Sequence, residues 1–83
     1  MKTILLLADD PASRERLAPL LELAGYGVHI APNGAPGVAL ALAHLPELVL
    51  CDVGLPVLDG YGVLAHFIQH LRLASVPFLL LAS

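Results

Sequence analysis

Short, uninterrupted apolar runs, separated by longer segments with helical spacing, limit the folds open to this chain. Residues 4–8 and 48–51 contain only apolar side chains, and residues 76–82 form a similar run in which Pro77 lies near the start. Such runs are typical of strands buried on both faces of a parallel sheet, and proline is tolerated near the start of a strand. The sequence therefore predicts a parallel sheet that helices cover on both faces.

The segment after the first run has the spacing of an amphipathic helix. Its apolar residues recur three and four positions apart, with charged residues between them, and they are Leu17, Leu20, Leu21 and Ala24. Pro11 suits the first turn of this helix, whereas Pro19 inside it predicts a kink, because proline removes a donor and clashes with the preceding turn. A short second strand is expected at residues 28–31, with His29 facing outward.

Two further helices are expected. In residues 36–45 larger apolar side chains alternate with alanines as in a strand, but alanine and leucine are strong helix formers, and we interpret this segment as a helix. Because this segment is apolar almost all round, we expect neighbours to cover most of it. A third helix should open at Gly60 with Asp59 as its cap, and its apolar positions show the i, i+3, i+4, i+7 pattern at Leu64, Phe67, Ile68 and Leu71.

Strands that alternate with helices predict an α/β fold. The order βαβαβαβ implies right-handed crossovers and a doubly wound parallel sheet in a single domain of residues 1–83.

Three aspartates follow two of the apolar runs. Asp9 and Asp10 come directly after the first run, and Asp52 ends the run at 48–51. Since the carboxyl ends of parallel strands meet at one edge of the sheet, these side chains are expected to converge there. Three carboxylates in one pocket need a cation, and Mg²⁺ prefers such oxygen ligands. Aspartates after a strand are also common turn and cap residues, and this alternative stays open for Asp9 and Asp10.

Composition excludes several classes of function. Four Lys and Arg residues against seven Asp and Glu give a net charge of −3, which argues against binding nucleic acid through its phosphates. The apolar stretches are too short to cross a bilayer, and no export signal precedes them. The single cysteine, Cys51, excludes an internal disulfide and fits a reducing compartment. We therefore expect a soluble, cytoplasmic protein.

Taken together, the carboxylates, the segment 56–60 and Ser83 after the last run resemble the receiver domain of two-component response regulators. The resemblance implies a flavodoxin-like sheet with strand order 2-1-3-4, in which Asp52 accepts a phosphoryl group from a histidine kinase or phosphotransfer protein. It also implies that Mg²⁺ binds Asp10, Asp52 and the Gly54 carbonyl, while Asp9 holds a metal-bound water. Ser83 matches the family's hydroxyl residue, which contacts the phosphoryl group.

The resemblance covers a receiver domain that is truncated after the fourth strand. The family's fifth strand, with a lysine that balances phosphoryl charge, has no counterpart, and neither Lys2 nor Arg72 is placed to replace it. An apolar, unpaired fourth strand predicts a homodimer through that edge.

Two other functions fit parts of the same pattern. A degenerate, non-phosphorylated receiver could serve as an association module. An aspartyl phosphohydrolase would need a second acid two residues after Asp52, where Gly54 stands, so no enzyme is expected. His66 and His70 have a spacing that suits zinc, but without a third ligand they are interpreted as ordinary surface or packed residues.

Overall fold

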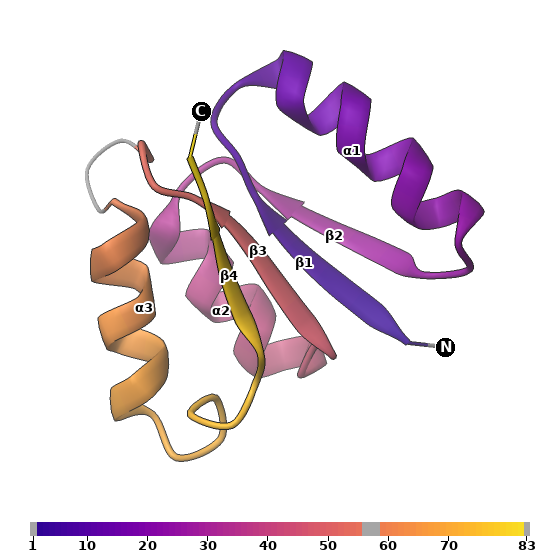
Figure 1. Cartoon of the computed structure of the whole chain (residues 1–83). Coiled ribbons are helices and arrows are strands. Elements are labelled where there is room, and N and C mark those ends of the chain that lie inside the picture. The colour runs from indigo at the N-terminus through magenta and orange to yellow at the C-terminus, as the bar shows by residue number, and fades with distance from the viewer. Residues whose placement is uncertain (1, 56–58, 83) are drawn as a thin grey trace.

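The computed structural model describes residues 2–55 and 59–82, while residues 1, 56–58 and 83 lie outside the described part. Strands and helices alternate along the chain (Figure 1). Their bounds are β1 (Thr3–Leu7), α1 (Pro11–Leu23), β2 (Gly27–Ala31), α2 (Gly34–His44), β3 (Leu48–Asp52), α3 (Gly60–Gln69) and β4 (Phe78–Leu81).

The strands form one parallel sheet in the order β2-β1-β3-β4. In this sheet Leu7 of β1 pairs with Cys51 of β3, and Asp52 pairs with Leu81 of β4. This arrangement confirms the predicted doubly wound α/β fold and its strand order. Within the described residues, no helix combines the length and the apolar character that a membrane span requires.

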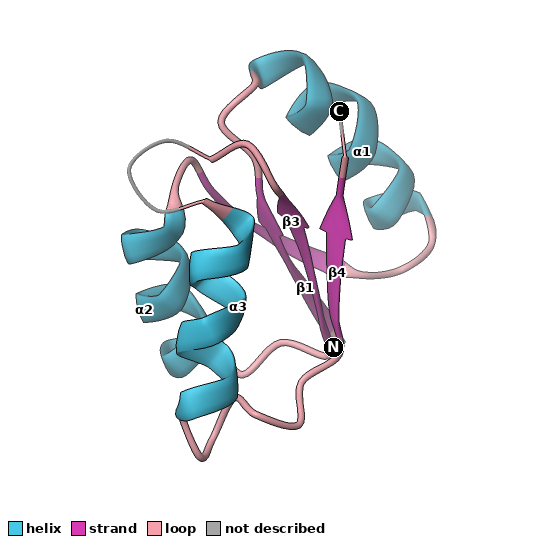
Figure 2. Ribbon diagram, turned by 60° about the vertical axis from the view of Figure 1, so that its left-hand side comes forward, coloured by secondary structure: helices cyan, strands magenta, loops and turns pink. Residues whose placement is uncertain are grey.

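Helices cover the two faces of the sheet unequally. Helix α1 lies on one face, while α2 and α3 lie side by side on the other (Figures 1 and 2). Alternate residues of a strand point to opposite faces, so Ile4 and Leu6 pack toward α1, whereas Leu5 and Leu7 pack toward α2 and α3. One core therefore forms on each side of the sheet.

Helix α2 approaches β1 closely at Gly37. A Cβ atom at this position would overlap the Leu7 side chain, so glycine allows the two backbones to come together. The expectation that neighbours would cover most of α2 was wrong. Ala35, Ala39 and Ala43 face solvent, because the helix rests on the sheet along one side only and small alanines expose little apolar area.

The apolar pattern of α3 predicted the helix but not all of its core. Phe67 is buried and meets the Phe78 ring edge-on at a centroid distance of 5.1 Å. Ile68, however, is 62% exposed although it lies within the helix, and Leu71 is 97% exposed because the helix ends at Gln69 and the chain turns away. The buried leucine of this turn is Leu73.

The expectation that His29 faces outward was also wrong. His29 is half-buried on β2 and stacks on His44 at the end of α2, with ring centroids 4.1 Å apart. Helix α1 is continuous from Pro11 to Leu23 with Pro19 inside it, and the kink expected there stays a prediction.

Candidate functional site

The carboxyl ends of β1 and β3 bring the three predicted acidic positions to one edge of the sheet. Because Leu7 pairs with Cys51, the chain that leaves β1 passes next to Asp52. Asp9 and Asp10 lie in this connection, both exposed. The convergence expected from the sequence therefore holds for the backbone positions.

Asp10 serves as the N-cap of α1. One carboxylate oxygen accepts a hydrogen bond from the Ala12 N–H at 3.1 Å, and the other accepts one from the Ser13 hydroxyl at 3.2 Å. Capping by a carboxylate satisfies donors that have no partner within the helix and complements the positive end of the helix dipole. The cap interpretation, which the sequence left open, is correct for Asp10.

Asp52 is held from two sides at the end of β3. Its Oδ1 atom accepts a hydrogen bond from the Gly54 N–H at 2.9 Å, and the next residue, Val53, donates its N–H to the Leu81 carbonyl at 3.1 Å. Asp52 is half-buried. The first bond fixes one carboxylate oxygen, and among the described residues no donor bonds to the other.

The start of α3 packs tightly behind Asp52. A Cβ atom on Gly60 would lie 2.8 Å from the Val53 Cα atom and 2.9 Å from the Asp52 carbonyl oxygen, so a larger residue would displace the backbone. Asp59 accepts a hydrogen bond from the Gly62 N–H at 2.9 Å and caps α3, as the sequence predicted. Glycine at position 60 therefore allows the start of α3 to lie against the end of β3.

The oxygen atoms at this edge have the chemistry that Mg²⁺ prefers, but the carboxylates are not gathered into a cluster. Among residues 2–55 and 59–82, no three His, Cys, Asp or Glu side chains lie close enough together to hold a metal ion. Both oxygens of Asp10 are engaged in capping α1. The donor set fits a hard cation, and binding it would draw on oxygens that now accept hydrogen bonds.

A cavity of about 90 Å³ opens beside Asp52. It lies between the first turns of α1 and the ends of β3 and β4, and its lining residues are Ala8, Ser13, Arg16, Leu17, Asp52, Leu81 and Ala82. Sequence reasoning missed Ser13 and Arg16. A signal existed, because both come after Asp10 at three-residue steps, which places them on the same side of a helix.

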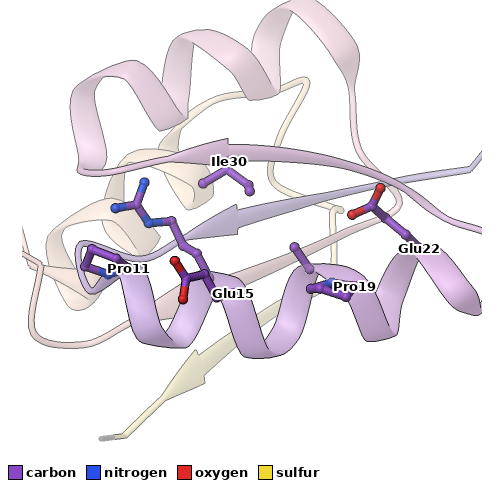
Figure 3. A pocket seen from close by; sticks show the side chains of 7 residues that line it. Pro11, Glu15, Pro19, Glu22 and Ile30 are labelled. Atoms are coloured by element: carbon purple, nitrogen blue, oxygen red, sulfur yellow. The ribbon is translucent and has the colours of Figure 1, made fainter.

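A larger cavity of about 420 Å³ lies elsewhere, between α1 and β2. Figure 3 shows Glu15, Pro19 and Glu22 along α1, with Ile30 of β2 opposite them. Arg14 also lines it and donates a hydrogen bond to the Asp9 carbonyl at 3.4 Å. None of the three aspartates lines this cavity, so it is separate from the carboxylate site.

Cys51, the residue before Asp52, is completely buried. Burial, followed by the nearby charges of Asp52 and Asp59, raises the pKa of its thiol from 9.0 to about 12. The thiol therefore stays protonated at neutral pH.

Several predicted residues do not join the site. Ser83 and positions 56–58 lie outside the described residues, so their predicted roles remain untested. The Nδ1 atom of His70 accepts a hydrogen bond from the Arg72 N–H at 3.2 Å, which gives this histidine a structural role in the turn after α3.

Comparison with known proteins identifies the family. A family model for the response regulator receiver domain matches residues 4–82. The DNA-binding dual master transcriptional regulator RpaA of Synechocystis is 39% identical over 83 residues, which are 100% of this chain and 34% of that protein. Protein PilH of Pseudomonas aeruginosa is 31% identical over 83 residues, which are 100% of this chain and 69% of that protein.

Solved structures show the same architecture. The chemotaxis response regulator CheY4 of Vibrio cholerae superposes with a TM-score of 0.91 at 25% identity, over 96% of this chain and 67% of that one. The receiver domain of a Pseudomonas aeruginosa sensor histidine kinase, solved with a magnesium ion coordinated in its active site cleft, gives a TM-score of 0.90 at 29% identity, over 95% of this chain and 65% of that one. With the family match over residues 4–82 and the sheet order 2-1-3-4, these similarities show that the chain belongs to the response regulator receiver domains of two-component signal transduction.

Proposed function

We propose that this receiver domain accepts a phosphoryl group on Asp52 in a Mg²⁺-dependent reaction. The observation that carries the proposal is the state of the Asp52 carboxylate. It is half-buried at the carboxyl end of a central strand, and the Gly54 N–H holds one of its oxygens. The other oxygen is left to act as a nucleophile beside a cavity.

The phosphoryl transfer needs only Asp52 and a phosphorylated histidine as reactants. An Asp52 oxygen forms a bond to phosphorus while the phosphorus–nitrogen bond of a phosphohistidine breaks, and the bonding pair goes to the imidazole nitrogen. Phosphoryl transfer asks the protein mainly for positioning and for stabilisation of negative charge. The hydrogen bond from Gly54 supplies positioning, because it orients the carboxylate before the donor arrives.

Magnesium is the cation that we propose for this edge. The residues that would hold it are Asp9, Asp10 and Asp52 with the Gly54 carbonyl, all of them oxygen donors. When bound, it would neutralise charge on the phosphoryl oxygens. The related receiver structure with a coordinated magnesium ion supports this choice.

The partners are inferred from the family. Receiver domains interact with histidine kinases or phosphotransfer proteins. We propose that such a protein donates the phosphoryl group to this domain and that both are cytoplasmic. The domain would act as a phosphoacceptor, with no separate substrate of its own. We also propose a homodimer through the β4 edge, since β4 pairs with β3 on one side and Leu79 is 54% exposed.

The test is phosphorylation by acetyl phosphate, followed by intact mass. The wild-type chain should gain the mass of one phosphoryl group when Mg²⁺ is present and none when a chelator removes the metal. Asp52→Asn should abolish the gain, because the nucleophilic oxygen is lost.

The matched control is Asp59→Asn. It removes the same charge near the site, and asparagine still caps a helix as well as aspartate does. This variant should be labelled like the wild type. Labelling that persists in Asp52→Asn, or that does not form in the wild type, would contradict the proposal.

A further inference from the structure

We propose that Arg16 of α1 donates hydrogen bonds to a phosphoryl group on Asp52 and supplies the positive charge that this group needs. The inference rests on the proposed phosphorylation of Asp52 and adds a binding residue to the same site. It is carried by the cavity that Arg16 and Asp52 line together.

The cavity has the size and composition of a small oxyanion site. Its volume of about 90 Å³ exceeds several times the roughly 10–15 Å³ that one water molecule requires. Asp52 lines the cavity from the end of β3, Ser13 and the exposed Arg16 line it from α1, and the other lining residues are apolar. A phosphoryl group that is attached to Asp52 and extends into this space would contact the side chains of α1.

The arrangement of the elements explains why α1 can reach the site. In both views the end of β4 points toward α1 (Figures 1 and 2). Leu81 packs into the core on the α1 side, and Ala82 lines the cavity next to it. Asp52 pairs with Leu81, so the carboxylate lies at the same edge.

Arg16 is the cationic residue that lines this cavity among the described residues. Arg14 is two positions earlier, about 200° around the helix, and it lines the other cavity and bonds to the Asp9 carbonyl. Arg72 lies between α3 and β4, at the opposite end of the sheet.

Charge favours this role. A phosphoryl group on Asp52 adds close to two negative charges to an edge that already carries Asp9 and Asp10. A guanidinium presents several N–H donors in a planar fork that matches phosphate oxygens, and such bonds are stronger than those between neutral groups. The positive charge of Arg16 therefore offsets the negative charge of the phosphoryl group, to which the carboxylates at this edge only add.

A purely structural role makes a different prediction. The aliphatic part of Arg16 could simply cover Leu17 and Leu81, with its charge in solvent. In that case a neutral side chain of similar length would leave anion affinity unchanged. The test must therefore separate anion affinity from folding stability.

The experiment uses beryllofluoride, a stable mimic of the phosphoryl group, in the presence of Mg²⁺. Binding to the 83-residue chain is followed by the ¹⁹F NMR signal of the bound fluoride, and thermal unfolding of each variant is recorded without beryllofluoride. Arg16→Gln should weaken binding by about 10- to 100-fold, the range expected for a hydrogen bond to a charged group. Arg16→Lys should restore part of the affinity. Arg72→Gln, with the same change in net charge, should bind like the wild type.

The outcomes separate the two proposals. If the wild type binds and Arg16→Gln binds equally well, the role of Arg16 is refuted while phosphorylation of Asp52 stands. If Arg16→Gln and Arg72→Gln weaken binding alike, only net charge matters and the role of Arg16 is again refuted. If the wild type itself does not bind, both proposals fail.

Discussion

The carboxylates of this domain show how one residue type takes up separate tasks in different parts of the chain. Asp10 and Asp59 cap helices with their side chains, whereas Asp52 keeps one oxygen without a donor among the described residues. The difference comes from the local structure on the C-terminal side of each aspartate. A helix begins directly after Asp10 and after Asp59, while a turn with Gly54 comes after Asp52.

Because of Cys51, the free energy of unfolding depends on pH in the alkaline range. Its pKa is raised from 9.0 to about 12 in the folded chain, first by burial and then by the charges of Asp52 and Asp59. The unfolded chain therefore releases the thiol proton first as pH rises. The contribution of Cys51 to stability is complete below about pH 9 and is lost as the pH rises toward 12.

Urea unfolding across the lower half of this interval measures the effect. We expect the free energy of unfolding to fall more steeply with pH in the wild type than in Cys51→Ala, which has no thiol to ionise. The variant should be less stable at every pH because it leaves a small void, so only the two slopes are compared. Parallel curves would show that burial does not hold the thiol proton.

The sequence predicted the roles of some residues, such as helix caps, and not those of others, such as Arg16. Helix caps depend on neighbours in the chain, so the cap at Asp59 was predicted correctly from its position before Gly60. The spacing of Arg16 from Asp10 placed both on one side of the helix, but the cavity that Arg16 lines also needs Leu81 and Ala82, which meet α1 only after β4 has joined the sheet.

Among the elements, strands were predicted more closely than helix surfaces. A run such as that of β3 is apolar throughout because the strand is covered on both faces, and this requirement can be read without knowing the neighbours. Helix α2 is apolar all round for a different reason. It uses Gly34, Gly37 and Ala41 to approach the sheet, and the alanines on its other side face solvent.

Helix α3 illustrates a related limit. Its pattern places Leu71 in line with Phe67, but the helix ends at Gln69 and Leu71 is 97% exposed. The cap residue His70 adopts an extended conformation with φ −98° and ψ 121°, which redirects the chain. Periodicity predicts which face is apolar only while the helix continues.

Strand β4 carries the proposed dimer contact. We expect the wild-type chain to sediment as a dimer at micromolar concentration, and Leu79→Glu to weaken the dimer by about 10-fold or more, because a half-exposed apolar side chain at the contact becomes charged. Leu71→Glu introduces the same charge on a side chain that is 97% exposed, and it should leave the dimer intact. A wild-type chain that sediments as a monomer would refute the contact.

At the scale of the whole molecule, the parallel sheet gathers the chemistry at one edge. Strand order 2-1-3-4 places the ends of β1, β3 and β4 together, and α1 starts above them. The residues that line the small cavity, Arg16 and Asp52 among them, thus come from separate parts of the chain. The sequence predicted the edge from topology, but not which side chains cap helices and which face the cavity.

Titration with Mg²⁺, followed by the backbone amide signals in ¹⁵N NMR, tests directly whether this edge is a cation site. We predict saturable shifts at millimolar Mg²⁺ that centre on Asp9, Asp10 and Gly54 and disappear in Asp52→Asn. Unchanged spectra, or weak shifts spread over exposed carboxylates such as Glu15 and Glu22, would contradict a magnesium-dependent site at the carboxyl edge of the sheet.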